Sequence, residues 1–268
     1  MPDNEGGSPA GAQERLAAAL REAGAIALRT FRAPVKSWLK DETSPVSEAD
    51  LAVDAFLREH LSGPGYGWLS EETAEDRSSR QAERLWIVDP IDGTRSYLAG
   101  QPDWVISVAL VVGGRPVLAG AFAPVTDELF LAAAGAGATR NGVAIRVSAG
   151  GALAGAKVAG PKRLVQSLAA ATQAEIAVPP RIGSLALRLI RVAQGELDIA
   201  FASASSHDWD LAGADLLVHE AGGVLTSLVG RSLTYNQPDL VHGALVAAGA
   251  DRHAALLALT REWLGELG

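Results

Sequence analysis

Apolar residues recur at helical spacing near the beginning of the chain. Between residues 12 and 33 they repeat every three or four positions, which predicts one amphipathic helix ending before Pro34. A second helix is predicted from Ser47, because Ser47 and Asp50 have the spacing of a capping box in front of an apolar stretch. Residues 1–11 lack such a pattern, and we expect a flexible tail there.

Strand-like runs replace the helical pattern after residue 84. The run "LWIVD" at 85–89 is an apolar strand that ends in a carboxylate. Residues 104–145 consist of short β-rich runs broken by Gly, Pro and an Asn-Gly pair, which predicts an antiparallel meander. We therefore expect an N-terminal α+β subdomain over 12–146.

The pattern changes again near residue 147, where strand-like and helix-like segments begin to alternate. Strands are expected at 157–159, 175–178, 197–202, 224–228 and 243–248, and helices at 163–173, 184–194, 209–221 and 253–266. This alternation is typical of an α/β layer and predicts a C-terminal α/β subdomain over 147–268. No Pro/Ser-rich linker separates the halves, so we expect them to pack as one body.

Composition narrows the classes of function. The chain has 268 residues, 48% hydrophobic, and no cysteine, which excludes disulfides and thiolate metal sites. The apolar run 105–112 is too short to span a bilayer, and the first residues do not resemble a signal peptide. We therefore expect a cytoplasmic protein without a membrane partner. The net charge of −8 argues against a nucleic-acid partner, although cations can still bridge the protein to a small phosphate.

The stretch "WIVDPIDGTRSYLAG" at 86–100 carries the strongest chemical signal. Asp89 and Asp92 follow the predicted strand and directly precede Gly93 and Thr94. Amides at the start of a helix bind phosphate, and a glycine lets the phosphate approach the backbone. Two aspartates would repel it unless a hard cation such as Mg²⁺, which prefers oxygen ligands, lies between them. Alone, the motif is equally consistent with a purely structural role, in which Asp89 ends a strand and Asp92 caps a helix.

Two further acidic clusters accompany this motif. Glu71 and Glu72 belong to "SEET", which is otherwise typical of a solvated acidic turn. Asp210 follows Trp209 at the front of an apolar helix, where a first-turn acid is also common. The chain offers no set of His and Cys ligands, which favours Mg²⁺ over Zn²⁺.

Taken in order, the E-E pair, D-P-I-D-G-T and W-D before E-A-G-G resemble the inositol monophosphatase superfamily of Mg²⁺-dependent, lithium-sensitive phosphatases. The resemblance covers residues 40–246 and includes "WLSEET", "RIGSLALRLIRVAQGELD" and "WDLAGADLLVHEAGG". It implies an αβαβα layered sandwich with the site between the halves. It also implies hydrolysis of a small phosphorylated metabolite by a homodimer with two to three Mg²⁺ ions per site.

The resemblance also implies the metal ligands. Glu71, Asp89 and the Ile91 carbonyl would hold one Mg²⁺, and Asp89, Asp92 and Asp210 would hold a second. A third, weaker ion would lie near Glu71.

The remaining roles follow from the same resemblance. The Gly93 and Thr94 amides would hold phosphate oxygens. Asp50 would accept a hydrogen bond from the Thr94 hydroxyl, and that pair with Glu71 would orient the attacking water. Glu71, Thr94 and Asp50 are thus the expected catalytic residues.

Arg95, Ser184, His207 and Asp210 are the expected substrate contacts. The Arg95 guanidinium can bind a second phosphate, although a solvated first-turn arginine is equally consistent with its position. His207 and Asp208 either contact the substrate or cap the helix that follows.

Substrate choice depends on one departure from the family pattern. Inositol-specific members carry a glutamate shortly before W-D, where this chain has Ala202 and Ser203. This departure and Arg95 favour a 3'(2'),5'-bisphosphate nucleotidase acting on 3'-phosphoadenosine 5'-phosphate. An inositol or sugar monophosphate, histidinol phosphate and a catalytically idle polyanion-binding relative are the alternatives.

Overall fold

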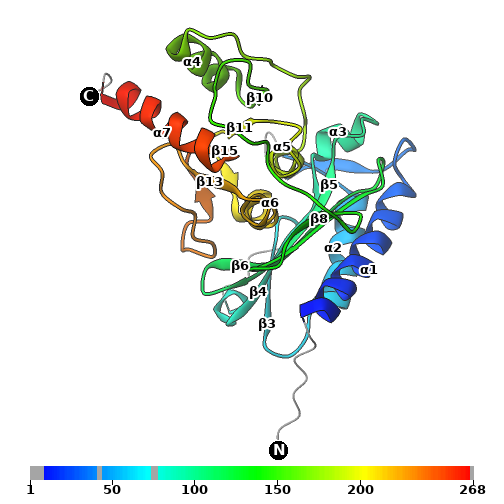
Figure 1. The fold of residues 1–268 in the computed structure, drawn as a ribbon. Coiled ribbons are helices and arrows are strands. Elements are labelled where there is room, and N and C mark those ends of the chain that lie inside the picture. The colour runs from blue at the N-terminus through cyan, green and yellow to red at the C-terminus, as the bar shows by residue number, and fades with distance from the viewer. Residues whose placement is uncertain (1–8, 41–43, 74–77, 266–268) are drawn as a thin grey trace, which may run out of the picture.

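The computed structural model describes residues 9–40, 44–73 and 78–265, and residues 1–8 of the expected tail lie outside this range. Helices and sheets alternate in five layers: a pair of helices, a seven-stranded sheet, a second pair of helices, a four-stranded sheet and a third pair of helices (Figure 1). The expected αβαβα sandwich is thus confirmed.

The larger sheet has the strand order β3-β4-β5-β6-β7-β8-β9. Its strands are β3 (Tyr66–Ser70), β4 (Arg84–Asp92), β5 (Val105–Val112), β6 (Arg115–Ala123), β7 (Glu128–Ala133), β8 (Gly137–Arg140) and β9 (Val143–Ala144). Strands β3 and β4 run parallel and β5 pairs antiparallel with β4. The strands from β5 onwards form the predicted antiparallel meander. Asn141 and Gly142 have φ values of 49° and 78° in the β8–β9 turn, as an Asn-Gly hairpin requires.

Helices α1 (Pro9–Leu28) and α2 (Glu48–Leu61) cover one face of this sheet. Helix α1 begins and ends earlier than predicted, and Arg32 already has a left-handed backbone with φ 59°. Helix α2 begins as predicted with a capping box, in which the Ser47 amide donates to Asp50 Oδ2 at 2.8 Å. The short hairpin β1 (Ser37–Leu39) and β2 (Pro45–Ser47) before α2 was not predicted.

Helices α5 (Leu185–Ala193) and α6 (Asp208–Glu220) lie on the opposite face, between the two sheets (Figure 1). Helix α6 is buried along nearly its whole length, as expected for a helix that packs against sheets on two sides. Gly213 permits the close approach, because a Cβ atom there would lie 2.7 Å from Ser107 Oγ. One apolar cluster includes Leu85 and Ile87 from the first half and Leu216 from the second, so the halves share a core.

The smaller sheet has the order β10-β11-β15-β13 and is covered on its far face by α4 (Lys162–Thr172) and α7 (Ala250–Gly265). Its strands are β10 (Val158–Ala159), β11 (Ile199–Ala202), β13 (Gly223–Ser227) and β15 (Leu245–Gly249). The remaining elements are η1 (Ser79–Gln81), α3 (Thr94–Leu98), β12 (Ser206–His207) and β14 (Val241–His242).

The strand expected at 175–178 was wrong. Only an isolated parallel bridge joins Lys157 and Ala177. Pro179 and Pro180 follow and lack amide donors, so a ladder cannot continue beyond Val178, which is exposed. The division of the chain at residue 147 stays a prediction.

None of the helices in the described ranges is long and apolar enough to cross a membrane. The expected cytoplasmic location stays a prediction.

Candidate active site

The end of strand β4 brings its two aspartates to the same side of the sheet. Residues three apart on a regular strand point to opposite faces. Here Asp89 lies opposite Ser107 and Asp92 opposite Val105, so three steps along β4 face two along β5. This extra residue is a β-bulge, and it restores a common direction for the two carboxylates.

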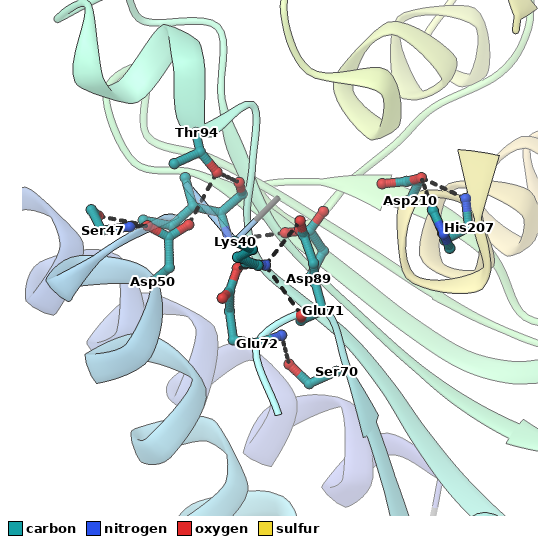
Figure 2. Close-up of polar contacts among 11 residues, drawn as sticks. Lys40, Ser47, Asp50, Ser70, Glu71, Glu72, Asp89, Thr94, His207 and Asp210 are labelled. Atoms are coloured by element: carbon teal, nitrogen blue, oxygen red, sulfur yellow. Dashed lines mark hydrogen bonds and ion pairs between the residues drawn. The ribbon is translucent and has the colours of Figure 1, made fainter. Parts of the chain in front are cut away.

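Asp210 completes a cluster of three carboxylates. It lies in the first turn of α6, and its Oδ2 accepts a 2.6 Å hydrogen bond from the His207 amide. Asp89, Asp92 and Asp210 each offer one oxygen, and these three oxygens lie within 4.8 Å of one another. Figure 2 shows Asp89 at the end of its strand and Asp210 on the neighbouring helix.

Burial and mutual repulsion raise the pKa values of the three clustered carboxyl groups. Burial, followed by the charges of Glu71 and Asp92, raises the pKa of Asp89 well above its usual range. Burial and then the charge of Asp92 do the same to Asp210. Burial raises the pKa of Asp92 to about 6. A cation among these oxygens would remove the repulsion, and an all-carboxylate set suits a hard cation.

Asp92 is fixed by a helix from the other half of the chain. Its Oδ2 accepts hydrogen bonds from Ser184 Oγ and the Ala186 amide, both at 2.5 Å. Ser184 Oγ in turn accepts a 2.9 Å bond from the Leu187 amide as the N-cap of α5. Asp92 therefore serves the start of α5, and not the start of the helix that follows it in sequence.

Ser184 thus has a different environment from the one expected of a substrate contact. Its side chain is fully buried, and its hydroxyl joins Asp92 to the first turn of α5. It is placed to hold the Asp92 carboxylate in position and is shielded from the cavity.

Gly93 and Thr94 begin the short helix α3. Gly93 has φ 98°, a left-handed conformation that glycine adopts without strain. The Thr94 hydroxyl lies 3.1 Å from Asp50 Oδ1 and 3.0 Å from the Ile91 carbonyl. Asp50 also accepts a 2.5 Å bond from Ser47 Oγ, so the capping box of α2 orients the acid that faces Thr94 (Figure 2).

Lys40 binds both acids of the E-E pair and was missed in the sequence. Its Nζ lies 3.2 Å from Glu71 Oε1 and 2.5 Å from Glu72 Oε1 (Figure 2). The Glu72 side chain is only 2% exposed, and burial raises its pKa to about 7. Glu72 therefore anchors Lys40, whereas Glu71 faces the cavity.

One cavity of about 700 Å³ collects most of the expected site residues. Its walls include Glu71, Asp89, Ile91, Asp92, Gly93, Thr94, Arg95 and Asp210. Two expected substrate contacts, Ser184 and His207, are not among the described residues that line this cavity.

The residues that flank Asp210 support the start of α6. The His207 ring stacks on Trp209 with centroids 4.6 Å apart. The buried Asp208 accepts bonds from His242 Nε2 at 2.7 Å and the Asn236 amide at 2.6 Å. Asp208 thus ties a neighbouring loop to the start of the helix.

Comparison with known proteins agrees with this geometry. The model of the inositol monophosphatase family matches residues 12–263. The chain belongs to the inositol monophosphatase family. The family resemblance in the sequence is therefore confirmed, and members named as inositol monophosphatases are phosphoric monoester hydrolases.

Three relatives illustrate the breadth of this family. An inositol-1-monophosphatase of Rhizobium meliloti is 39% identical over 76% of this chain and 80% of its own length. The Nus factor SuhB of Escherichia coli is 30% identical over 92% of this chain and 95% of its own. The solved structure of the extragenic suppressor protein SuhB from Bartonella henselae has a TM-score of 0.82 and 28% identity, covering 94% of this chain and 99% of that one.

Proposed function

We propose that this protein hydrolyses a small phosphomonoester with the help of Mg²⁺. The observation that carries the proposal is the cluster of Asp89, Asp92 and Asp210 in a cavity that also holds Glu71 and Thr94. These acids, with the Ile91 carbonyl, would hold the metal ions. When bound, such ions neutralise a phosphate dianion, lower the pKa of water and stabilise the leaving oxygen.

The protein groups supply orientation. The Gly93 and Thr94 amides would hold phosphate oxygens at the start of α3. Because the Thr94 hydroxyl donates to Asp50, its oxygen lone pairs are directed to accept a proton from an attacking water. Glu71 would be the second acceptor for that water, and the displacement would proceed in line, without a phosphorylated enzyme.

Replacing Thr94 by alanine should test this orientation. We expect the kcat of Thr94→Ala to fall by about a hundredfold or more, the scale of losing a proton-accepting group, with little change in KM. Thr94→Ser keeps the hydroxyl and should retain most of the turnover. Steady-state kinetics would contradict the role of Thr94 if KM rose strongly while kcat stayed constant, since Thr94 would then only bind phosphate.

Two substrate classes have specific support. The name of the Rhizobium meliloti relative favours an inositol monophosphate. Ala202 and Ser203, in place of an acid that would bind sugar hydroxyls, favour a bisphosphate nucleotide, and Arg95 lines the cavity where a second phosphate would pass. None of the three relatives named above is called a bisphosphate nucleotidase. We therefore propose the inositol monophosphate and the bisphosphate nucleotide as two candidate substrates of this site.

A panel of substrates would test the proposed reaction. Phosphate release should be measured with Mg²⁺ from inositol 1-phosphate, 3'-phosphoadenosine 5'-phosphate and histidinol phosphate. We expect saturable turnover of at least one of the first two. Absence of release from the entire panel would contradict the proposal and favour an idle polyanion-binding relative. The expected homodimer, lithium sensitivity and lack of a nucleic-acid partner stay predictions.

A further inference from the structure

A second cavity of about 730 Å³ adjoins the carboxylate cavity on the side of α5. Arg181, Gly183 and Asp210 line both cavities, so the two cavities adjoin at these residues. A ligand held by its phosphate in the first cavity would extend past these residues into the second.

Arg188 lines this second cavity and is a half-buried cation whose Nε is sealed from solvent. Its Nε is inaccessible to solvent and has no hydrogen-bond partner. Within the part of the chain that the structure describes, its guanidinium forms no hydrogen bond or ion pair. Arg191, one turn further along α5, shows the usual solution, because it makes two bonds of 2.8 and 2.7 Å to Glu128. Partial burial removes much of the water around the Arg188 charge, and no protein anion replaces that water, so its place on the cavity wall points to an anion supplied by a ligand.

Asp92 does not supply that anion. It is the acid whose charge acts on Arg188, but the two side chains form no ion pair, and Asp92 Oδ2 is already bonded to Ser184 and Ala186. Burial lowers the pKa of Arg188 and the charge of Asp92 opposes this, yet an arginine stays protonated at neutral pH.

The rest of the cavity wall also suits an anion. Lys162 and Arg181 are exposed at its surface, and Ser203 and Ser205 add hydroxyl groups. Asp210 is the single acid among its described lining residues, and its carboxylate belongs to the cluster of three in the first cavity. Positive charge therefore exceeds negative charge along this wall.

We propose that this second cavity binds a second oxyanion of the substrate, a phosphate or a carboxylate, and that Arg188 makes the main contact. The planar guanidinium matches either group with two parallel hydrogen bonds. The inference rests on the proposed phosphatase activity and deepens it, because it limits the substrates to phosphomonoesters with a second anionic group. It favours the nucleotide candidate over an inositol monophosphate.

Two matched pairs of substrates would test the inference. Adenosine 3',5'-bisphosphate and adenosine 3'-phosphate differ by a phosphate, and 2-phosphoglycerate differs from glycerol 2-phosphate by a carboxylate. In each pair, the ratio of the two kcat/KM values measures the preference for the second anion. We expect a ratio of about ten or more in at least one pair, the scale of one charge-assisted contact, and the pair in which it occurs identifies the anion.

Variants of Arg188 would assign that preference. Arg188→Gln should remove most of it, and Arg188→Lys should retain part of it, since lysine keeps the charge without the planar geometry. Arg163→Gln makes the same change in net charge at an exposed position on α4 outside the cavity and should behave as the parent protein does. Equal losses on both members of a pair would overturn the inference, because Arg188 would then act through Asp92. A parent protein without any preference would overturn it as well.

A binding measurement separates this inference from the proposed function. Calorimetry with Ca²⁺ in place of Mg²⁺ would compare adenosine 3',5'-bisphosphate with adenosine 3'-phosphate on the parent protein and Arg188→Gln. Arg188-dependent preference in binding without turnover would support the subsite and contradict the phosphatase proposal. Turnover without such preference would contradict the subsite alone.

Discussion

Chelation with EDTA should abolish phosphate release by this protein, and added Mg²⁺ should restore it. The three clustered carboxylates lie within 4.8 Å of one another, so without a cation they repel a phosphate dianion. Mg²⁺ reverses the local sign of charge and supplies the activation of water that the side chains alone lack. Release should be measured on dialysed protein with a substrate that the panel identifies.

Other cations provide controls for this experiment. Excess Ca²⁺ should inhibit, because it is larger and coordinates with less regular geometry than Mg²⁺. Lithium should inhibit as the family resemblance implies. Full activity after dialysis against EDTA would contradict the proposed mechanism and would leave the carboxylates without a catalytic role.

Asp92→Asn should retain the fold and lose about a thousandfold in kcat/KM, the scale of deleting one strong electrostatic contact to the transition state. An asparagine carbonyl oxygen can replace Asp92 Oδ2 as acceptor for Ser184 and Ala186. The change therefore preserves the link to α5 while removing the negative charge that a metal requires. Asp127→Asn, the same substitution at an exposed surface carboxylate, is the matched control and should keep full activity.

Thermal unfolding in EDTA gives Asp92→Asn a second readout. Burial raises the pKa of Asp92 from 3.8 to about 6, so its contribution to stability is present below pH 3.8 and is lost as the pH rises through about 6. Above that range the metal-free variant should have a Tm equal to or above that of the parent, and the difference should shrink towards acidic pH.

The activity of the same variant decides whether Asp92 has a catalytic role. A variant that keeps more than about half the activity would show that Asp92 is only a structural cap.

Local sequence patterns predicted those elements that are stabilised by residues close to one another in the sequence. Ser47 and Asp50 predicted the start of α2, and Asn141-Gly142 predicted a hairpin turn. The layer order followed from family resemblance, because periodicity does not say which sheet a helix covers. The strand expected at 175–178 failed because its apolar character was read without the proline pair that follows.

The sequence predicted which residues form the candidate site better than it predicted how they are arranged in space. Spacing alone places Asp89 and Asp92 on opposite faces of a strand, and only the bulge opposite Ser107 and Val105 brings them together. Contacts between distant segments carried no sequence signal. The bond from Ser184 to Asp92 spans 92 residues, and the one from Lys40 to Glu72 spans 32. The sequence likewise could not predict that Arg188 lacks an ion-pair partner, because the fold determines which acids lie near it.

Helix α5 limits how a descendant of this protein can acquire a new substrate. At its first turn, Ser184 and Ala186 donate hydrogen bonds to Asp92, while Arg188, one turn later, lines the second cavity. A shift or tilt of the whole helix would reshape that cavity but would also displace Asp92 from the carboxylate cluster on which the proposed hydrolysis depends. Exchange of single side chains beyond the first turn has no such penalty. New specificities are thus expected to arise by substitution at positions such as 188, on a helix whose axis stays in place.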